Sequence, residues 1–299
     1  MSEPLRVGLI GAGSIAAKHL EVFAAHPQRL RLAAVCDINE TAARAAAAAL
    51  GVERVFVDFR RMLDEVELDA VDICSVHDVH AEQAIAAARR GLHVLVEKPM
   101  AVSMEQCVAM VAEARKAGVR LMVAQNQRYK ANYRAIRNVV RSGELGRILC
   151  ARVESQSARA ARSSERSWLF DGSRAGGGVV ISLALHRVDL LRFLVGEIRR
   201  VFAHCRTTDP RYVNGAENWA TALFEFEDGA LGEMFATNGA YRTVWGESLI
   251  IFGENGTVHA MPTLVSYSGP AMIASSSRPE PPPPVELGEK DRKSRYARA

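Results

Sequence analysis

Apolar runs and helix-forming segments alternate along the first 125 residues of the chain. Six short apolar runs have the length and composition of buried strands, at 5–11, 31–37, 55–57, 71–76, 93–99 and 120–126. The segments between them are predicted helices, over 14–25, 41–50, 59–65, 80–90 and 104–117. Apolar strands that alternate with helices predict an α/β domain with a doubly wound parallel sheet covered on both faces.

The pattern changes after residue 125. Helices are predicted over 133–142 and 179–195, and a strand over 147–157. Farther along the chain, Asp228-Gly229 and Asn255-Gly256 each separate two strand-like segments, which is typical of β-hairpins. This half of the chain therefore predicts an α+β domain built on an antiparallel sheet.

The composition shifts again near residue 275. The last segment contains four consecutive prolines and many charges, which cannot form a packed core. We expect a mobile tail there, and a docking ligand for a partner domain is the alternative. The sequence thus divides into three parts, residues 1–125, 126–274 and 275–299.

A glycine-rich turn between the first strand and the first helix carries the clearest chemical signal. It reads Gly11-Ala12-Gly13-Ser14-Ile15-Ala16, in the position that a dinucleotide-binding fingerprint requires. Gly11 allows the tight turn, and Gly13 lets a pyrophosphate approach the backbone. The helix that follows presents N–H groups to the phosphates. We therefore assign Gly11, Gly13, Ser14 and Ile15 to cofactor binding.

Asp37 ends the second predicted strand, about 20 residues beyond the fingerprint. An acid at this place is expected to accept hydrogen bonds from ribose hydroxyls, and its charge opposes the 2′-phosphate of NADP. Arg44 is the nearest downstream arginine and does not lie beside Asp37. The sequence therefore favours NAD over NADP, and the alternative is that Asp37 only caps the next helix.

Two further groups stand where ligands bind. Lys98, in Glu97-Lys98-Pro99, follows the fifth strand at its carboxyl end, the edge at which open α/β sheets bind ligands. Its ammonium can reach a nicotinamide and a substrate hydroxyl there. The triple glycine 176–178, whose backbone is expected to approach a ligand, precedes a helix that carries Ser182 and His186 four residues apart on one face. Taken singly, a surface lysine and a structural histidine remain the alternatives.

Together, these segments resemble the Gfo/Idh/MocA oxidoreductases, the glucose–fructose oxidoreductase and inositol dehydrogenase group. The resemblance covers roughly residues 5–260, and four segments carry it: GLIGAGSIAAKH (8–19), AVDICSVHDVHAEQAIAAARRGLHVLVEKPMA (70–101), QNQRYKANYRAIRNVVRSGELGRI (125–148) and GGGVVISLALHRVDLLRFLVG (176–196). It implies an N-terminal Rossmann domain that binds NAD(P). It also implies a C-terminal substrate-binding α+β domain with an open, mostly antiparallel sheet, through which a homodimer or homotetramer forms.

The resemblance also implies roles for individual residues. Lys98 matches the lysine that binds nicotinamide and substrate, and His186 matches the histidine that accepts the substrate's hydroxyl proton during hydride transfer. Further cofactor-binding residues are then Ser75, His77, His80 and Glu97. The substrate-binding residues are then Asn126, Arg128, Tyr129, Trp168, Ser182 and His186. This chemistry is sound, because a histidine near its ordinary pKa suits the proton step and a lysine stabilises a developing alkoxide.

Three features depart from the family pattern. Ser182 stands where the family often has an aspartate, so it offers no charge to an imidazolium, although Asp189 is a possible substitute. Ser75-Val76-His77 replaces the usual threonine–proline–asparagine. His77 and His80 lack an evident third ligand, so we expect no metal. The chain also ends soon after the last predicted strands, which indicates a compact branch, a truncation, or a surface covered by an oligomeric partner.

Composition and charge exclude several classes of protein. The chain is 48% hydrophobic and 24% charged, as in soluble globular proteins, and no apolar stretch is long enough to cross a membrane. A net charge of +4 without a basic stripe argues against a nucleic-acid partner. Five cysteines lack disulfide or zinc spacing, and the first residues lack the pattern of a signal peptide. We therefore expect a cytoplasmic protein.

These observations predict an NAD(P)-dependent oxidoreductase. It would transfer a hydride between nicotinamide and a secondary alcohol or ketone of a sugar or cyclic polyol derivative. A redox-neutral NAD-dependent hydrolase or eliminase of the same family is one alternative, and it would form no net NADH. A non-catalytic nucleotide-binding sensor is the other; Ser182 favours it, whereas Lys98 and His186 oppose it.

Overall fold

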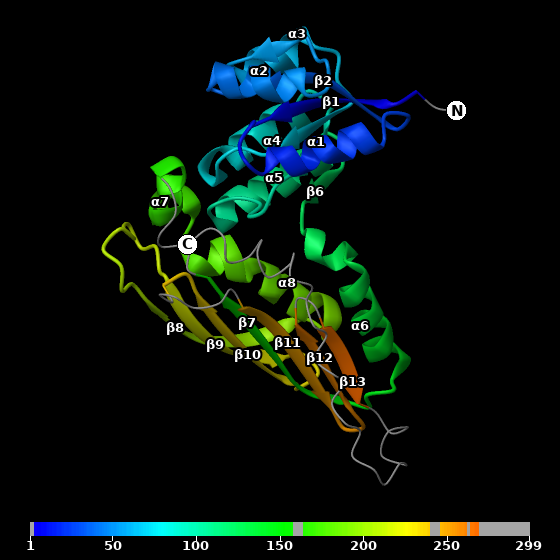
Figure 1. Cartoon of the computed structure of the whole chain (residues 1–299), viewed down its shortest axis with the longest axis vertical. Coiled ribbons are helices and arrows are strands. Elements are labelled where there is room, and N and C mark those ends of the chain that lie inside the picture. The colour runs from blue at the N-terminus through cyan, green and yellow to red at the C-terminus, as the bar shows by residue number, and fades with distance from the viewer. Residues whose placement is uncertain (1–2, 158–163, 240–245, 262–263, 269–299) are drawn as a thin grey trace, which may run out of the picture.

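The computed structural model describes residues 3–157, 164–239, 246–261 and 264–268, and these residues form two sheets (Figure 1). The first sheet and its helices occupy the upper part of the molecule in that view, and the second sheet lies below, with helices on the face turned toward the first. The predicted tail, 275–299, lies outside the described residues. No helix among the described residues is long and apolar enough to cross a membrane.

The first sheet has six parallel strands in the order β3-β2-β1-β4-β5-β6. They are β1 (Leu5–Ile10), β2 (Leu30–Cys36), β3 (Val55–Phe56), β4 (Ala70–Ile73), β5 (His93–Val96) and β6 (Leu121–Val123). The strand order reverses between β1 and β4, and this switch point opens a crevice at the carboxyl ends of the strands. The doubly wound sheet predicted from the sequence is therefore confirmed.

Five α-helices accompany this sheet: α1 (Ala16–Ala25), α2 (Glu40–Ala48), α3 (Phe59–Glu65), α4 (His80–Ala88) and α5 (Met104–Lys116). The side chains on the two faces of the sheet belong to two separate apolar clusters. Leu9 belongs to one cluster, while the next residue, Ile10, belongs to the other. Because successive side chains of a strand point to opposite faces, both faces are buried, as the continuous apolar runs predict.

The second sheet has seven strands in the order β13-β12-β11-β7-β10-β9-β8. They are β7 (Ile148–Gln156), β8 (Ile198–Arg206), β9 (Trp219–Phe226), β10 (Leu231–Thr237), β11 (Gly246–Gly253), β12 (Thr257–Met261) and β13 (Leu264–Ser268). Only β7 and β10 pair in parallel; the other described pairs are antiparallel. Both predicted hairpins, β9–β10 and β11–β12, are confirmed.

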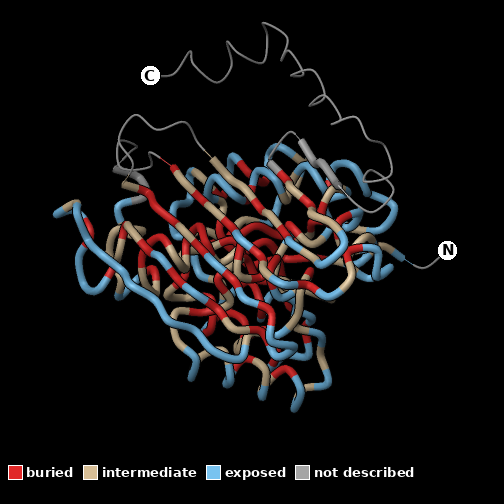
Figure 2. The backbone as a smooth tube through the Cα atoms, turned by 90° about the horizontal axis from the view of Figure 1, so that it is seen from below, coloured by how far each residue is buried: buried red, intermediate tan, exposed pale blue. Residues whose placement is uncertain are grey.

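One face of the second sheet packs on α6 (Ala131–Ser142) and α8 (Leu185–Leu194). Along β9, Ala220, Ala222, Phe224 and Phe226 are buried, and the residues between them are exposed or half-buried. Figure 2 shows this alternation of buried and exposed segments along the central strands. The alternation leaves the other face of the sheet open, as in antiparallel sheets with one solvated side.

The predicted helix over 179–195 is divided in two. A π-helical segment, Val180–Ala184, precedes α8. Short segments lie on either side of the crevice: the 3₁₀ turns His77–Val79, Asn126–Tyr129 and Ser164–Phe170, and α7 (Gly172–Ala175). π-Helical turns occur often at functional sites, and this one lies where Ser182 was predicted to act.

Candidate active site

A cavity of about 780 Å³ lies at the carboxyl ends of the parallel strands. Its walls include most of the predicted cofactor residues and two predicted substrate residues. These are Gly11, Ser14, Ile15, Asp37, Ser75, His77, Glu97, Lys98, Trp168 and Ser182. Residues from both halves of the sequence therefore share one cavity, at the switch point where α/β sheets bind nucleotides.

The two fingerprint glycines have different physical reasons to be glycine. Gly11 has φ of 95°, and a Cβ there would lie 2.6 Å from the main chain of Cys74 and Ser75. Gly13 has no neighbouring heavy atom within 4 Å of such a Cβ. The side chain of Ile15, the residue before α1, makes no cap hydrogen bond. Gly11 thus permits close packing of two loops, while Gly13 leaves open space near the N-terminus of α1, which fits a pyrophosphate.

Asp37 is held in place at the end of β2. One carboxylate oxygen accepts the Ala12 N–H at 2.7 Å, and the other accepts the Asn39 N–H at 2.7 Å. Asn39, rather than Asp37, supplies the side-chain cap of α2. Asp58 and Arg60 also line this cavity. The Asp37 carboxylate suits hydrogen bonds from ribose hydroxyls.

Lys98 connects the two halves of the site. Its Nζ donates to the Ser182 carbonyl oxygen at 2.9 Å, and its main-chain N–H donates to Glu97 Oε2 at 3.0 Å. Ser182 is buried within the π-helical segment. The ammonium therefore lies where the first sheet meets the helices of the second domain.

His186 lies one turn beyond Ser182, and it does not itself line the cavity. Its Nδ1 is 3.2 Å from Gln125 Oε1. Burial, followed by the nearby charges of Lys98 and Arg187, lowers the pKa of His186 to about 3. The imidazole is therefore neutral at physiological pH. With Gln125 Oε1 accepting from Nδ1–H, Nε2 is left as the basic nitrogen.

Gln125 was missed by the sequence analysis. It follows β6 at the same sheet edge as Lys98, directly before the predicted Asn126, so its position was the available signal. Asn126 itself is exposed and lines neither cavity of the described structure.

The two predicted histidines after β4 differ in their surroundings: His77 lines the cavity, and His80 does not. The His77 ring lines the cavity edge-on to Trp168, with ring centroids 4.6 Å apart, and its Nδ1 lies 2.9 Å from the Ala175 carbonyl oxygen. Burial lowers the pKa of His77 to about 4. His80 is completely buried, with Nδ1 2.8 Å from the Pro99 oxygen and Nε2 3.1 Å from the Ser75 oxygen. His80 thus supports the loops that carry Ser75 and Lys98.

Arg128 and Tyr129 line a second cavity of about 600 Å³ beside α5 and α8. The Arg128 guanidinium donates to both carboxylate oxygens of Asp189, at 2.8 and 2.6 Å. Asp189 is therefore paired with Arg128, and the expectation that it could serve His186 is not met. The structure thus separates these two predicted substrate residues from Trp168 and Ser182.

The triple glycine packs against the chain itself, and not against open space for a ligand. A Cβ on Gly178 would lie 1.8 Å from the Glu217 carbonyl oxygen. The Glu217 carboxylate accepts the N–H groups of Gly178 at 2.8 Å and Val180 at 2.7 Å. The expected approach of a ligand is not met at Gly178, because the missing side chain there allows Glu217 to cap the π-helical segment.

Comparisons with known proteins identify the family of both halves of the chain. The family model for the GFO/IDH/MocA oxidoreductases, an NAD-binding Rossmann fold, matches residues 5–125, and the model for the GFO/IDH/MocA C-terminal domain matches residues 133–259. Myo-inositol 2-dehydrogenase of Thermotoga maritima is 28% identical over 261 residues, covering 86% of this chain and 75% of that protein.

Two solved structures are similar to most of this chain. The WlbA dehydrogenase from Bordetella pertussis, in complex with NADH and UDP-GlcNAcA, is 34% identical with a TM-score of 0.80, covering 86% of this chain and 78% of that one. Levoglucosan dehydrogenase, in complex with NADH and L-sorbose, is 29% identical with a TM-score of 0.83, covering 93% of this chain and 78% of that one.

Proposed function

The chain belongs to the GFO/IDH/MocA oxidoreductase family, and we propose that it transfers a hydride between NAD and a secondary alcohol or ketone of a sugar or cyclic polyol derivative. The observation that carries this proposal is the meeting of Lys98 with the Ser182 carbonyl, one turn from the neutral His186. Lys98 thereby connects the nucleotide cavity to the helical segment that precedes the base His186. Relatives named for inositol and levoglucosan support a sugar-like substrate.

The cavity fits NAD along its length. Gly13 and the N-terminus of α1 would bind the pyrophosphate, Asp37 the adenine ribose, and Lys98 the nicotinamide end. When bound, the nicotinamide supplies the hydride acceptor. We favour NAD over NADP because the Asp37 carboxylate would repel a 2′-phosphate.

The chain's own residues handle the proton. His186 Nε2 accepts the hydroxyl proton of the substrate, and Gln125 keeps Nδ1 protonated and the ring oriented. Lys98 Nζ donates to the same substrate oxygen and stabilises the negative charge that develops on it. The packed rings of Trp168 and His77 form part of the cavity wall and would exclude water.

A non-catalytic nucleotide-binding sensor is the second candidate. It is favoured by the neutral Ser182 and Gln125, because neither residue stabilises a charged imidazolium at position 186. In the hydride-transfer proposal no negative charge stabilises the His186 imidazolium, so Lys98 must lower the energy of the step by stabilising the alkoxide.

Two further proposals concern assembly and location. We propose that a second copy of the chain packs on the open face of the seven-stranded sheet, where Phe202, Leu223 and Leu231 are each more than half exposed. We also propose a reducing, cytoplasmic location, because all five cysteines are unpaired. Intact-mass measurement after alkylation of protein isolated from the cell, without added reductant, tests the location: five alkylated thiols support it, and a disulfide contradicts it.

The function is tested by NADH formation across aldoses, inositols, amino sugars and sugar acids, with NAD and NADP in parallel. We expect one substrate group to reduce NAD faster than NADP. Lys98→Met should lower kcat by about 100-fold or more, whereas the exposed Lys116→Met on α5 should not. NADH binding without turnover on any substrate would instead support the sensor.

A further inference from the structure

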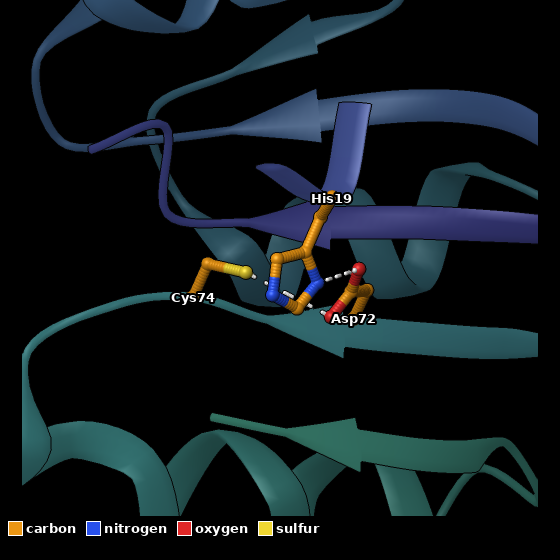
Figure 3. A group of neighbouring side chains, drawn as sticks. All are labelled: His19, Asp72 and Cys74. Carbon is orange, nitrogen blue, oxygen red and sulfur yellow. Dashed lines mark hydrogen bonds and ion pairs between the residues drawn. The ribbon is translucent and has the colours of Figure 1, made fainter. Parts of the chain in front are cut away.

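His19 is a buried histidine that the proposed mechanism does not use. It lies on α1, and its side chain is 15% exposed and points toward Asp72 of β4 (Figure 3). Its Nδ1 is 2.8 Å from Asp72 Oδ2, and its Nε2 is 3.2 Å from Glu97 Oε1. Cys74 completes the group, with its Sγ 3.8 Å from Asp72 Oδ1. Two buried carboxylates thus face the two nitrogens of one ring.

This arrangement requires a charged ring. A neutral imidazole has one N–H, so it can satisfy only one of the two carboxylates, whereas an imidazolium donates to both. Burial opposes the charge, but hydrogen bonds with Asp72, Cys74 and Glu97 raise the pKa of His19 to about 12. Burial raises the pKa of the Cys74 thiol to about 12, so the cysteine stays neutral.

A proton explains the group better than a metal ion does. His19, Asp72 and Cys74 present ligand atoms within 4.8 Å of one another, which makes them the candidate metal cluster of the described residues. However, a metal needs a deprotonated ring nitrogen and a thiolate. Both ring nitrogens lie at hydrogen-bond distance from carboxylates, and the thiol is protonated.

The ring connects the nucleotide helix to the catalytic lysine. Glu97 Oε1 faces His19, and its other oxygen, Oε2, accepts the main-chain N–H of Lys98 at 3.0 Å. Although burial raises the pKa of Glu97, the hydrogen bonds from His19 and Lys98 lower it below its usual range. The ionised Glu97 carboxylate therefore accepts the main-chain N–H of Lys98 through one oxygen and contacts the His19 ring through the other.

We propose that His19 is a positioning residue: its imidazolium joins α1 to Asp72 and Glu97, and through Glu97 it fixes the backbone from which Lys98 reaches the substrate. The proposal rests on the proposed function only for the role of Lys98. The charge state of His19 and its contact with Glu97 do not depend on any substrate.

The first test uses the unaltered protein and no substrate. Ring ¹⁵N chemical shifts of the eight histidines are followed by NMR from about pH 5 to pH 9. We expect one ring to remain protonated on both nitrogens at the upper end, where every other ring is neutral. A protein in which every ring becomes neutral by about pH 8 overturns the proposal, whether or not an activity has been found.

The second test measures the pH profile of kcat/KM for His19→Gln. A glutamine carries no positive charge, and its two N–H donors sit on one nitrogen in place of two ring nitrogens, so the pKa of Glu97 should rise and the carboxylate that accepts the Lys98 N–H should be protonated as pH falls. We expect the acid limb of the profile to move upward by about one pH unit or more. His26→Gln, at the exposed end of the same helix, is the matched control and should leave the limb in place.

The double variant His19→Gln/Glu97→Gln identifies the titrating group. With no carboxyl left at position 97, the acid limb should return toward its original pH, although kcat stays reduced. An activity loss in His19→Gln that is equal at all pH values would show a merely structural role and overturn the proposal. An inactive unaltered protein would count against the proposed function, while the NMR result still decides the charge of His19.

Discussion

His186 carries the proton step of the proposed reaction, and its surroundings set the pH range in which it can act. Because burial and neighbouring cations lower its pKa to about 3, the ring stays a neutral base far below the ordinary pKa of 6.5. Gln125 orients the ring but brings no negative charge. The cost of forming the imidazolium is therefore high, and Lys98 must stabilise the other product of the step, the alkoxide.

Gln125→Glu tests this account of His186. A carboxylate at the Nδ1 side stabilises the imidazolium, so the pKa of His186 should rise. Because the base is inactive once protonated, the acid limb of kcat/KM should move upward by about one pH unit or more. Gln125→Met is the control, since it removes the hydrogen bond without adding charge and should lower activity with the limb unmoved. Identical limbs in the two variants would contradict the account.

Single residues show which parts of the site a sequence can reveal. The shared position of Gly11, Asp37 and Lys98 at one cavity was predictable because each stands at a strand end, and the ends of parallel strands share one edge of the sheet. The partners of His186 and Arg128 were not predictable. Whether Asp189 faces His186 or Arg128 depends on side-chain rotamers and on the packing of α8 against the 126–129 turn.

At the scale of elements, strand ends are set by neighbouring strands. The apolar run predicted as a strand over 71–76 ends as β4 at Ile73, which pairs with the last residues of both β1 and β5, Ile10 and Val96. The Cys74 N–H still donates to the Ile10 carbonyl oxygen at 2.7 Å, and the pairing of β4 with β1 ends there. The helix over 179–195 likewise begins as a π-helical segment held by Glu217, a residue remote in sequence. A partner so distant in the sequence leaves no signal in the residues of the segment itself, so the π-helical turn could not be predicted.

The contact between Gly178 and Glu217 gives a stability prediction. Gly178→Ala would place a Cβ 1.8 Å from the Glu217 carbonyl oxygen, so the π-helical segment must shift. We expect a loss of about 3 kcal/mol or more in the free energy of unfolding, measured by urea denaturation. Gly91→Ala, where φ is 77° but the space is open, should lose only about 1 kcal/mol. Equal losses in the two variants would show that the contact is unimportant.

At the scale of the whole molecule, two sheets of different kinds enclose one site and leave one face open. The doubly wound first sheet and the antiparallel character of the second were predictable. Continuous apolar runs indicate a sheet that is buried on both faces, and alternating runs indicate a sheet with one solvated face. The parallel pairing of β7 with β10 was not, since those strands are separated by α8 and two further strands. The open face of the second sheet is the part of the molecule that most needs a partner.

Leu223→Glu tests whether that face joins two copies of the chain. Leu223 lies on the open face in β9, the strand between β8 and β10, and is 52% exposed. A charge buried in a symmetric interface appears on both partners, so the variant should shift the molar mass by light scattering toward that of one chain. Val108→Glu, on an exposed site of α5, should leave the mass unchanged. A monomeric unaltered protein would contradict the proposed assembly.

The central claim is hydride transfer to NAD, with Lys98 and His186 acting on the oxygen of the substrate. The most direct measurement is mass spectrometry of the cofactor after reaction with the most active sugar or polyol, deuterated at the carbon that is oxidised. We predict that the deuterium is recovered on the nicotinamide ring of NADH, and that Lys98→Met reduces its rate of transfer. Recovery of NADH without the label, or of unreduced NAD alongside unchanged substrate, would contradict the account.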